Sequence, residues 1–123
     1  MLMTFRQIHG EGSRIAENEW CIAKRCTAPG VDSCLVIVAP VAGDKKFILH
    51  LVQVQYDYFT DEDADSVLRI MTGAGADVNN VTLRGAVGDW ENSDNAACQR
   101  LLNRLNVTAS GRRHSTGSIE IGD

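Results

Sequence analysis

Long apolar runs are missing from this sequence. Hydrophobic residues make up 44% of its 123 residues, but no stretch comes near the roughly 20 consecutive apolar residues that a membrane-spanning helix needs. The opening residues, MLMTFRQIHGEG, also lack the basic segment and the apolar segment of a secretory signal peptide. We therefore expect a cytoplasmic protein without membrane insertion; the alternative is an effector that is translocated into another cell.

An excess of positive charge is missing as well. The chain has 12 Lys and Arg against 16 Asp and Glu, for a formal net charge of -4. Its basic residues are scattered along the sequence, whereas nucleic-acid-binding proteins gather positive charge on one face or along a groove. The sequence therefore predicts no nucleic-acid partner.

Internal repeats, low-complexity tracts and linker-like segments are absent too. A chain of 123 residues is long enough to form one continuous hydrophobic core. The sequence therefore predicts a single domain over residues 1–123.

The first half of the chain is rich in β-forming residues. MTFRQIH alternates apolar and polar side chains and predicts an opening strand, whereas RIAENEWCIAKRC fits either a strand or a short helical piece. CLVIVAP ends at Pro40, which cannot donate to a sheet ladder, and KFILHLVQV follows the turn VAGDK. We expect these two runs to pair antiparallel in the middle of a layered structure, because both are apolar on both faces.

Two helices are predicted in the second half. Thr60 and Asp63 form a variant capping box, and the helix that they begin ends near Gly73 and Gly75. Ser93 is the expected cap of a second helix. The core-facing positions of the two helices are Ala64, Val67, Leu68 and Met71, and Cys98, Leu101, Leu102 and Leu105.

NVTLRGAVG and SIEIG predict two further strands, and SGRRHSTG predicts a turn between the second helix and the last strand. Strands with two helices inserted late indicate an α+β fold. We expect a layered β-sheet or β-sandwich core with the two helices packed on it.

Four cysteines are present, and without a secretion signal we expect them to be reduced. Cys98 lies in the apolar stripe of the second helix, where a thiol behaves as a small hydrophobe. Cys21 and Cys26 only half meet the ligand spacing of a zinc site, even together with Cys34 and His50. We therefore expect no metal site.

Cys34 stands where a turn leads into a strand. Pro29 and Gly30 favour a turn, and Asp32 and Ser33 favour turns or caps. A cysteine at such a junction can expose its sulfur beside free backbone N–H groups, which lower the thiol pKa and can hold an oxyanion. The alternative is that Cys34 is simply the first buried residue of the strand.

His50 lies within an apolar strand, where an imidazole is costly unless it is hydrogen-bonded. It is either a core histidine bonded to a backbone carbonyl or a general base for a thiol on the neighbouring strand. If the turn VAGDK joins the two strands, Cys34 and His50 lie towards the same end of the pair. We expect them to be within proton-transfer reach at a water-accessible place.

The order of these motifs is similar to that of a known family. Thr27, the turn GVDSC and the strand KKFILHLV follow one another along the chain. This order resembles the CheD family of chemoreceptor glutamine deamidases, and DADSVLRIMTGAGADVNNVTLRGAVG, NSDNAACQRLLNRLNV and GRRHSTGSIEIG extend the resemblance over roughly residues 24 to 122. Bacterial deamidase toxins such as the cytotoxic necrotizing factors share the catalytic arrangement and the fold.

The resemblance implies a CheD-like domain with the activity of a cysteine-dependent protein-glutamine deamidase. Cys34 is then the nucleophile, His50 is the general base, and Thr27 or Asp32 holds the imidazole ring. No metal or organic cofactor is implied. The implied partner is a protein that presents an accessible glutamine, either a chemoreceptor or a host protein.

Two other functions stay open. The first is a non-catalytic protein-binding module on the same fold, with Cys34 as a structural residue. Asp32 favours this alternative, because a carboxylate near a thiol raises the thiol pKa. The second is another reaction of the Cys34–His50 pair, either cysteine-protease cleavage or a transglutaminase-like transfer.

Overall fold

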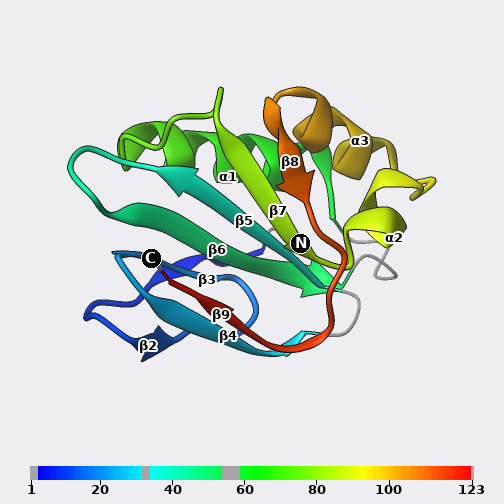
Figure 1. Cartoon of the computed structure of the whole chain (residues 1–123). Coiled ribbons are helices and arrows are strands. Elements are labelled where there is room, and N and C mark those ends of the chain that lie inside the picture. Colours follow the sequence, from blue (N-terminus) through cyan, green and yellow to red (C-terminus); the bar gives the residue numbers. More distant parts are fainter. Residues whose placement is uncertain (1–2, 32–33, 54–58, 123) are drawn as a thin grey trace.

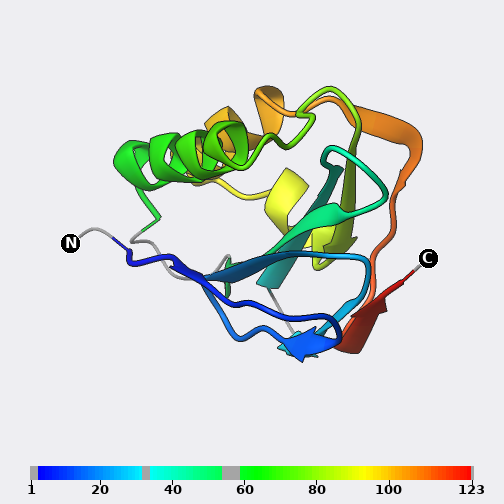
Figure 2. The ribbon, with the colours of Figure 1, turned by 90° about the vertical axis from the view of Figure 1, so that its left-hand side faces the viewer.

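The computed structural model describes residues 3–31, 34–53 and 59–122, and this part of the chain forms three layers (Figure 1). Helices cover one face of a six-stranded sheet, and a three-stranded sheet lies against its other face (Figure 2). The predicted α+β fold, with layered sheets and helices packed on them, is confirmed. None of the helices in these ranges combines the length and apolar character that crossing a membrane requires.

The large sheet has the strand order β1-β3-β6-β5-β7-β8, and the small sheet has the order β2-β4-β9. The strands of the large sheet are β1 (Arg6–Gln7), β3 (Glu19–Ala23), β6 (Lys46–Gln53), β5 (Cys34–Pro40), β7 (Val81–Gly85) and β8 (Val107–Arg112). The strands of the small sheet are β2 (Ser13–Arg14), β4 (Cys26–Val31) and β9 (Gly117–Ile121). The helices are α1 (Asp61–Gly73), α2 (Val87–Glu91) and α3 (Ala96–Asn103).

Strands β5 and β6 form the predicted antiparallel pair at the centre of the large sheet. Alternate residues of β5 face the two cores on either side of this sheet. Leu35 and Ile37 face the helices, whereas Cys34, Val36 and Val38 face the small sheet. The pair is therefore covered on both faces, as its continuous apolar sequence predicts.

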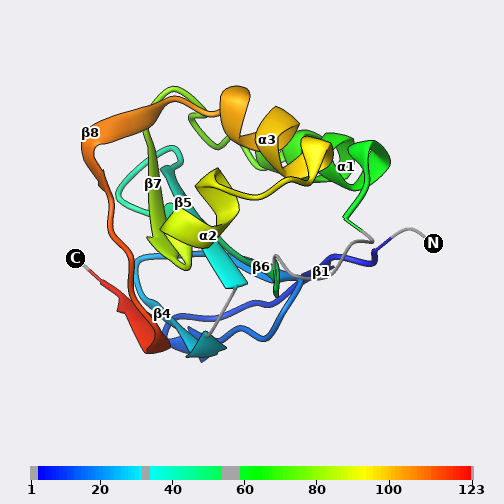
Figure 3. The same ribbon diagram turned by 90° about the vertical axis from the view of Figure 1, so that its right-hand side faces the viewer.

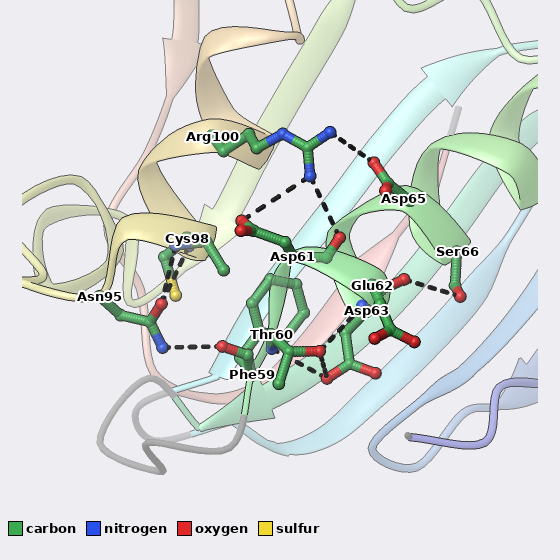
Figure 4. A network of polar contacts seen from close by, with 11 residues as sticks. Phe59, Thr60, Asp61, Glu62, Asp63, Asp65, Ser66, Asn95, Cys98 and Arg100 are labelled. Carbon is green, nitrogen blue, oxygen red and sulfur yellow. Dashed lines mark hydrogen bonds and ion pairs between the residues drawn. The ribbon is translucent and has the colours of Figure 1, made fainter. Parts of the chain in front are cut away.

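Helix α1 begins as predicted. The Thr60 hydroxyl accepts a hydrogen bond from the N–H of Asp63, and the Asp63 carboxylate accepts one from the N–H of Thr60. The predicted cap of α3 is wrong, because Asn95, not Ser93, accepts from the N–H groups of Ala97 and Cys98 (Figure 4). Ser93 instead accepts a hydrogen bond from the N–H of Asn95.

Three local predictions fail, the first two because tertiary pairing overrides turn propensity. Pro29 and Gly30 do not form the predicted turn. Strand β4 continues through them with a bulge, and Gly30 has a φ of 65°. Residues 107–112 form β8 against β7, where the sequence predicts a turn from residue 110. The strand predicted over residues 80–88 ends at Gly85, and the short α2 begins beside it (Figure 3).

Candidate active site

Cys34 begins β5 and faces the core between the two sheets. Its carbonyl oxygen accepts a hydrogen bond from the N–H of Ala86 at 2.8 Å, so β5 is tied at this point to the segment that leaves β7. Only 1% of Cys34 is exposed. The prediction of a water-accessible sulfur is therefore wrong for this conformation. The predicted turn residues Asp32 and Ser33 lie outside the described residues.

His50 lies on the same face of the large sheet as Cys34. It is opposite Val36 in the β5–β6 register, while Cys34 is opposite Gln53, with a bulge between the two pairs. Cys34 and His50 therefore lie towards the same end of the pair, remote from the turn, as predicted. The expected proton-transfer contact is not made in this conformation, because the Nε2 of His50 has no hydrogen-bond partner among the described residues, which include Cys34.

The ring of His50 is held by the main chain of another segment. Its Nδ1 lies 2.9 Å from the carbonyl oxygen of Ile15. A carbonyl oxygen only accepts hydrogen bonds, so Nδ1 carries a proton and donates it to Ile15. His50 is 2% exposed, and its Nε2 makes no hydrogen bond within the part of the chain that the structure describes. The Ile15 carbonyl thus fixes the orientation of the ring, and Nε2 is left without a partner in this part of the chain.

Thr27 does not occupy the place predicted for it. On β4 the side chains of Cys26 and Ala28 are buried towards the core, and that of the intervening Thr27 alternates to the outer face. There Thr27 lines a surface hollow. Its carbonyl oxygen accepts a hydrogen bond from the N–H of Ile15 at 2.8 Å. Thr27 therefore supports the group that holds His50 through its backbone, and its hydroxyl is not brought to the ring.

Two charged residues lie in the same row as His50 on this face of the sheet. Glu19 on β3 is directly opposite His50, and Arg84 on β7 is directly opposite Val36. Arg84 is thereby a diagonal neighbour of Cys34 on the side away from His50. Burial, with the nearby charge of Arg113, lowers the pKa of Arg84, but an arginine stays protonated at neutral pH.

Sequence reasoning missed the Ile15 carbonyl and Arg84. No residue type marks a backbone carbonyl as a ligand of an imidazole, so the sequence holds no signal for Ile15. Arg84 does leave a signal, because VTLRG alternates buried and half-buried positions and puts Arg84 on the opposite face from Leu83. Its place beside Cys34 depends on the β5–β7 register, which only the folded sheet fixes.

Cys98 is a core residue, in agreement with its position in the predicted apolar stripe. Burial raises the pKa of its thiol to about 11, although a hydrogen bond with Ser93 opposes that shift. Cys98 is therefore an unreactive thiol at neutral pH. Nowhere in residues 3–31, 34–53 and 59–122 do three His, Cys, Asp or Glu side chains gather in an arrangement that holds a metal ion.

The arrangement combines the parts of a cysteine nucleophile site. A thiol and an imidazole share one face of the sheet, a carbonyl orients the imidazole, and Arg84 lies on the neighbouring strand on the other side of Cys34. Such a pair can generate a thiolate and move its proton. The chain matches no protein-family model and no curated protein sequence, so the function has to be argued from this geometry.

Proposed function

We propose that the chain is a cysteine-dependent protein-glutamine deamidase, which converts a glutamine side chain of a protein substrate to glutamate. The proposal depends chiefly on His50, whose Nδ1 is bound to the Ile15 carbonyl while its buried Nε2 has no partner among the described residues. A buried polar atom without a partner costs about 1–3 kcal/mol. A role as proton acceptor for Cys34 accounts for that cost.

In the proposed reaction the thiolate of Cys34 attacks the carboxamide carbon of the substrate. His50 takes the thiol proton at Nε2 and passes it to the departing ammonia. Water activated by the same imidazole then hydrolyses the thioester, and glutamate is released. The Ile15 carbonyl stabilises the imidazolium that forms in between, the positive charge of Arg84 favours the thiolate, and backbone N–H groups at Cys34 hold the oxyanion.

The substrate class follows from the resemblance to the CheD family. A protein with an accessible glutamine is the proposed partner, either a chemoreceptor in the same cell or, if the protein is translocated, a protein of a host. Cys34 is buried at the start of a central strand, where a free amino acid has little surface to bind, whereas a protein segment brings binding area of its own.

A second function is favoured by one observation. Since Cys34 is 1% exposed, a glutamine side chain does not touch its sulfur in this conformation. A non-catalytic protein-binding module, with Cys34 as a packed core residue, is consistent with that burial. The two functions differ in whether Cys34 reacts in the native protein, and this difference can be measured without knowing the substrate.

The deciding experiment is timed alkylation of the native chain with iodoacetamide at pH 7, followed by peptide mapping. Cys98 serves as the internal reference, because burial raises the pKa of its thiol to about 11. We expect Cys34 to be labelled more than about tenfold faster than Cys98, as an activated thiol is. Equal, slow labelling of the two residues would overturn the deamidase proposal and favour the binding module.

Activity is then tested on the cytoplasmic fragment of a bacterial chemoreceptor and on a library of glutamine-containing peptides. Deamidation releases ammonia from the side chain, adds about one dalton and leaves the peptide backbone uncut. A protease would shorten the substrate, and a transglutaminase-like enzyme would couple added methylamine to the glutamine. We expect Cys34→Ser to abolish the mass shift and the matched Cys98→Ser to retain it.

A further inference from the structure

Two thiols that play no part in the proposed reaction lie against each other in the core between the sheets. Cys21 is on β3 of the large sheet and Cys26 is on β4 of the small sheet. Both are free and buried, at 0% and 2% exposure. Their side chains are hydrogen-bonded to each other, so the two sulfur atoms are in contact.

The backbone between these cysteines is short and anchored. β3 ends at Ala23 and β4 begins at Cys26. The carboxylate of Glu11 accepts hydrogen bonds from the N–H groups of Lys24 and Arg25 at 2.9 and 3.2 Å. The bend is therefore held in a form that keeps Cys21 and Cys26 facing each other.

Solvent lies close to this pair. A surface hollow of about 530 Å³ is lined by Cys26 together with Arg25, Thr27 and Glu120. The hollow therefore brings solvent up to the strand that carries Cys26. The other two cysteines do not line it.

From the contact, the short anchored connection and the adjoining hollow, we propose that Cys21 and Cys26 are an oxidation site, which hydrogen peroxide converts to a reversible disulfide between the two sheets. This inference is independent of the proposed deamidase function. It changes the expectation that all four thiols stay reduced, because that expectation rested on the compartment alone.

The roles of the two cysteines follow from their mutual hydrogen bond. The bond lowers the pKa of Cys21 and raises that of Cys26. Cys21 is then the sulfur that attacks first and Cys26 the sulfur that resolves the product.

The chemistry balances in two steps. The Cys21 thiolate attacks one oxygen of the peroxide, the O–O bond breaks, and the released hydroxide takes a proton to become water. Cys26 then attacks the sulfur of the Cys21 sulfenic acid, the S–O bond breaks, and that hydroxide leaves as water with the Cys26 proton. Both sulfurs are oxidised, both peroxide oxygens are reduced, and two thiols with one peroxide yield one disulfide and two waters.

The test is a peptide map of the full native chain after peroxide treatment and alkylation of the remaining thiols. Trypsin cuts after Lys24 and Arg25, between the two cysteines, so a disulfide leaves two fragments joined. A second protease that cuts before Asp32 separates Cys26 from Cys34 and identifies the sulfur used. We expect residues 15–24 joined to residues 26–31, about two daltons lighter than the two reduced peptides, and separated again by dithiothreitol.

Two variants sharpen the result. Cys26→Ser should abolish the joined fragment, and Cys98→Ser, the matched control, should form as much of it as the wild type. Absence of the joined fragment from the treated wild-type chain, or a link from Cys21 to Cys34 in its place, would overturn the proposal. That wild-type result decides the question even if the Cys26→Ser chain fails to fold.

Discussion

At the scale of single residues, Gly85 packs closely against the backbone at the start of β5. Its φ is 84°, and a Cβ at this position would lie 2.5 Å from the carbonyl oxygen of Cys34. A side chain here therefore meets both an unfavourable backbone conformation and the backbone that carries the proposed nucleophile.

We predict that Gly85→Ala lowers the free energy of unfolding by more than about 1–2 kcal/mol, the cost of a left-handed backbone alone. Urea denaturation measures this change. Gly43→Ala is the matched control, because Gly43 has a φ of 82° but nothing within 4 Å of its added Cβ. An equal loss in both variants would show that the contact with Cys34 adds nothing.

The pH dependence of labelling gives a second prediction at this scale. Because burial raises the pKa of Cys98 to about 11, its thiol is neutral at pH 7 and becomes thiolate only as the pH rises. We predict that alkylation of Cys98 in the native chain accelerates about tenfold per pH unit between pH 8 and pH 10. A rate that levels off near pH 9, as for a solvent-exposed cysteine, would contradict the raised pKa.

At the scale of elements, two kinds of contact join α3 and its cap to the start of α1 (Figure 4). Asn95 caps α3 and also donates from Nδ2 to the carbonyl oxygen of Phe59 at 3.0 Å. Arg100 forms ion pairs with Asp61 and Asp65 at 3.7 and 2.9 Å, and all three side chains are exposed to solvent.

We predict that Asn95→Ala lowers the free energy of unfolding by about 2 kcal/mol, the upper end of the cost of losing a helix cap. Arg100→Ala should cost less than about 1 kcal/mol, because solvent screens exposed ion pairs. Thermal or urea unfolding followed by circular dichroism compares the two. A larger loss for Arg100→Ala would reverse this ranking of the two contacts.

At the scale of the whole molecule, one pair of strands belongs to two cores. On β6 the side chain of Ile48 is buried against the small sheet, and that of the next residue, Leu49, is buried under the helices. The helices and the small sheet therefore both pack on the backbone of β6, so we expect the two layers to unfold together.

We predict that Ile48→Ala and Leu49→Ala each lower the free energy of unfolding by about 2–5 kcal/mol and leave a single cooperative transition. The measurement is urea unfolding followed in parallel by far-ultraviolet circular dichroism and by the fluorescence of Trp90, in a Trp20→Phe background. Trp90 is buried in the helix-side core. Two separate transitions in Ile48→Ala would show that the small sheet unfolds on its own.

The parts of the fold that were predicted correctly are those with a strong local pattern. The continuous apolar sequence of β5 and β6 requires cover on both faces, and the turn between them sets an antiparallel pairing. The spacing of apolar residues after Thr60, together with the capping box, sets α1. The segments predicted wrongly, such as β4 and β8, have weak patterns and become strands only because a partner strand supplies their hydrogen bonds.

The sequence by itself determined the α+β class, the central strand pair and the position of Cys34 and His50 towards one end of it, since side-chain alternation and turn position are local properties. Only the tertiary structure decided what surrounds them. Four features show this: the Ile15 carbonyl at the imidazole ring, the outward-facing side chain of Thr27, the position of Arg84 next to Cys34 in the sheet, and the contact of Cys21 with Cys26. Each of them depends on segments that are distant in sequence or lie on different sheets. Such contacts depend on register and layer packing, which no local pattern encodes.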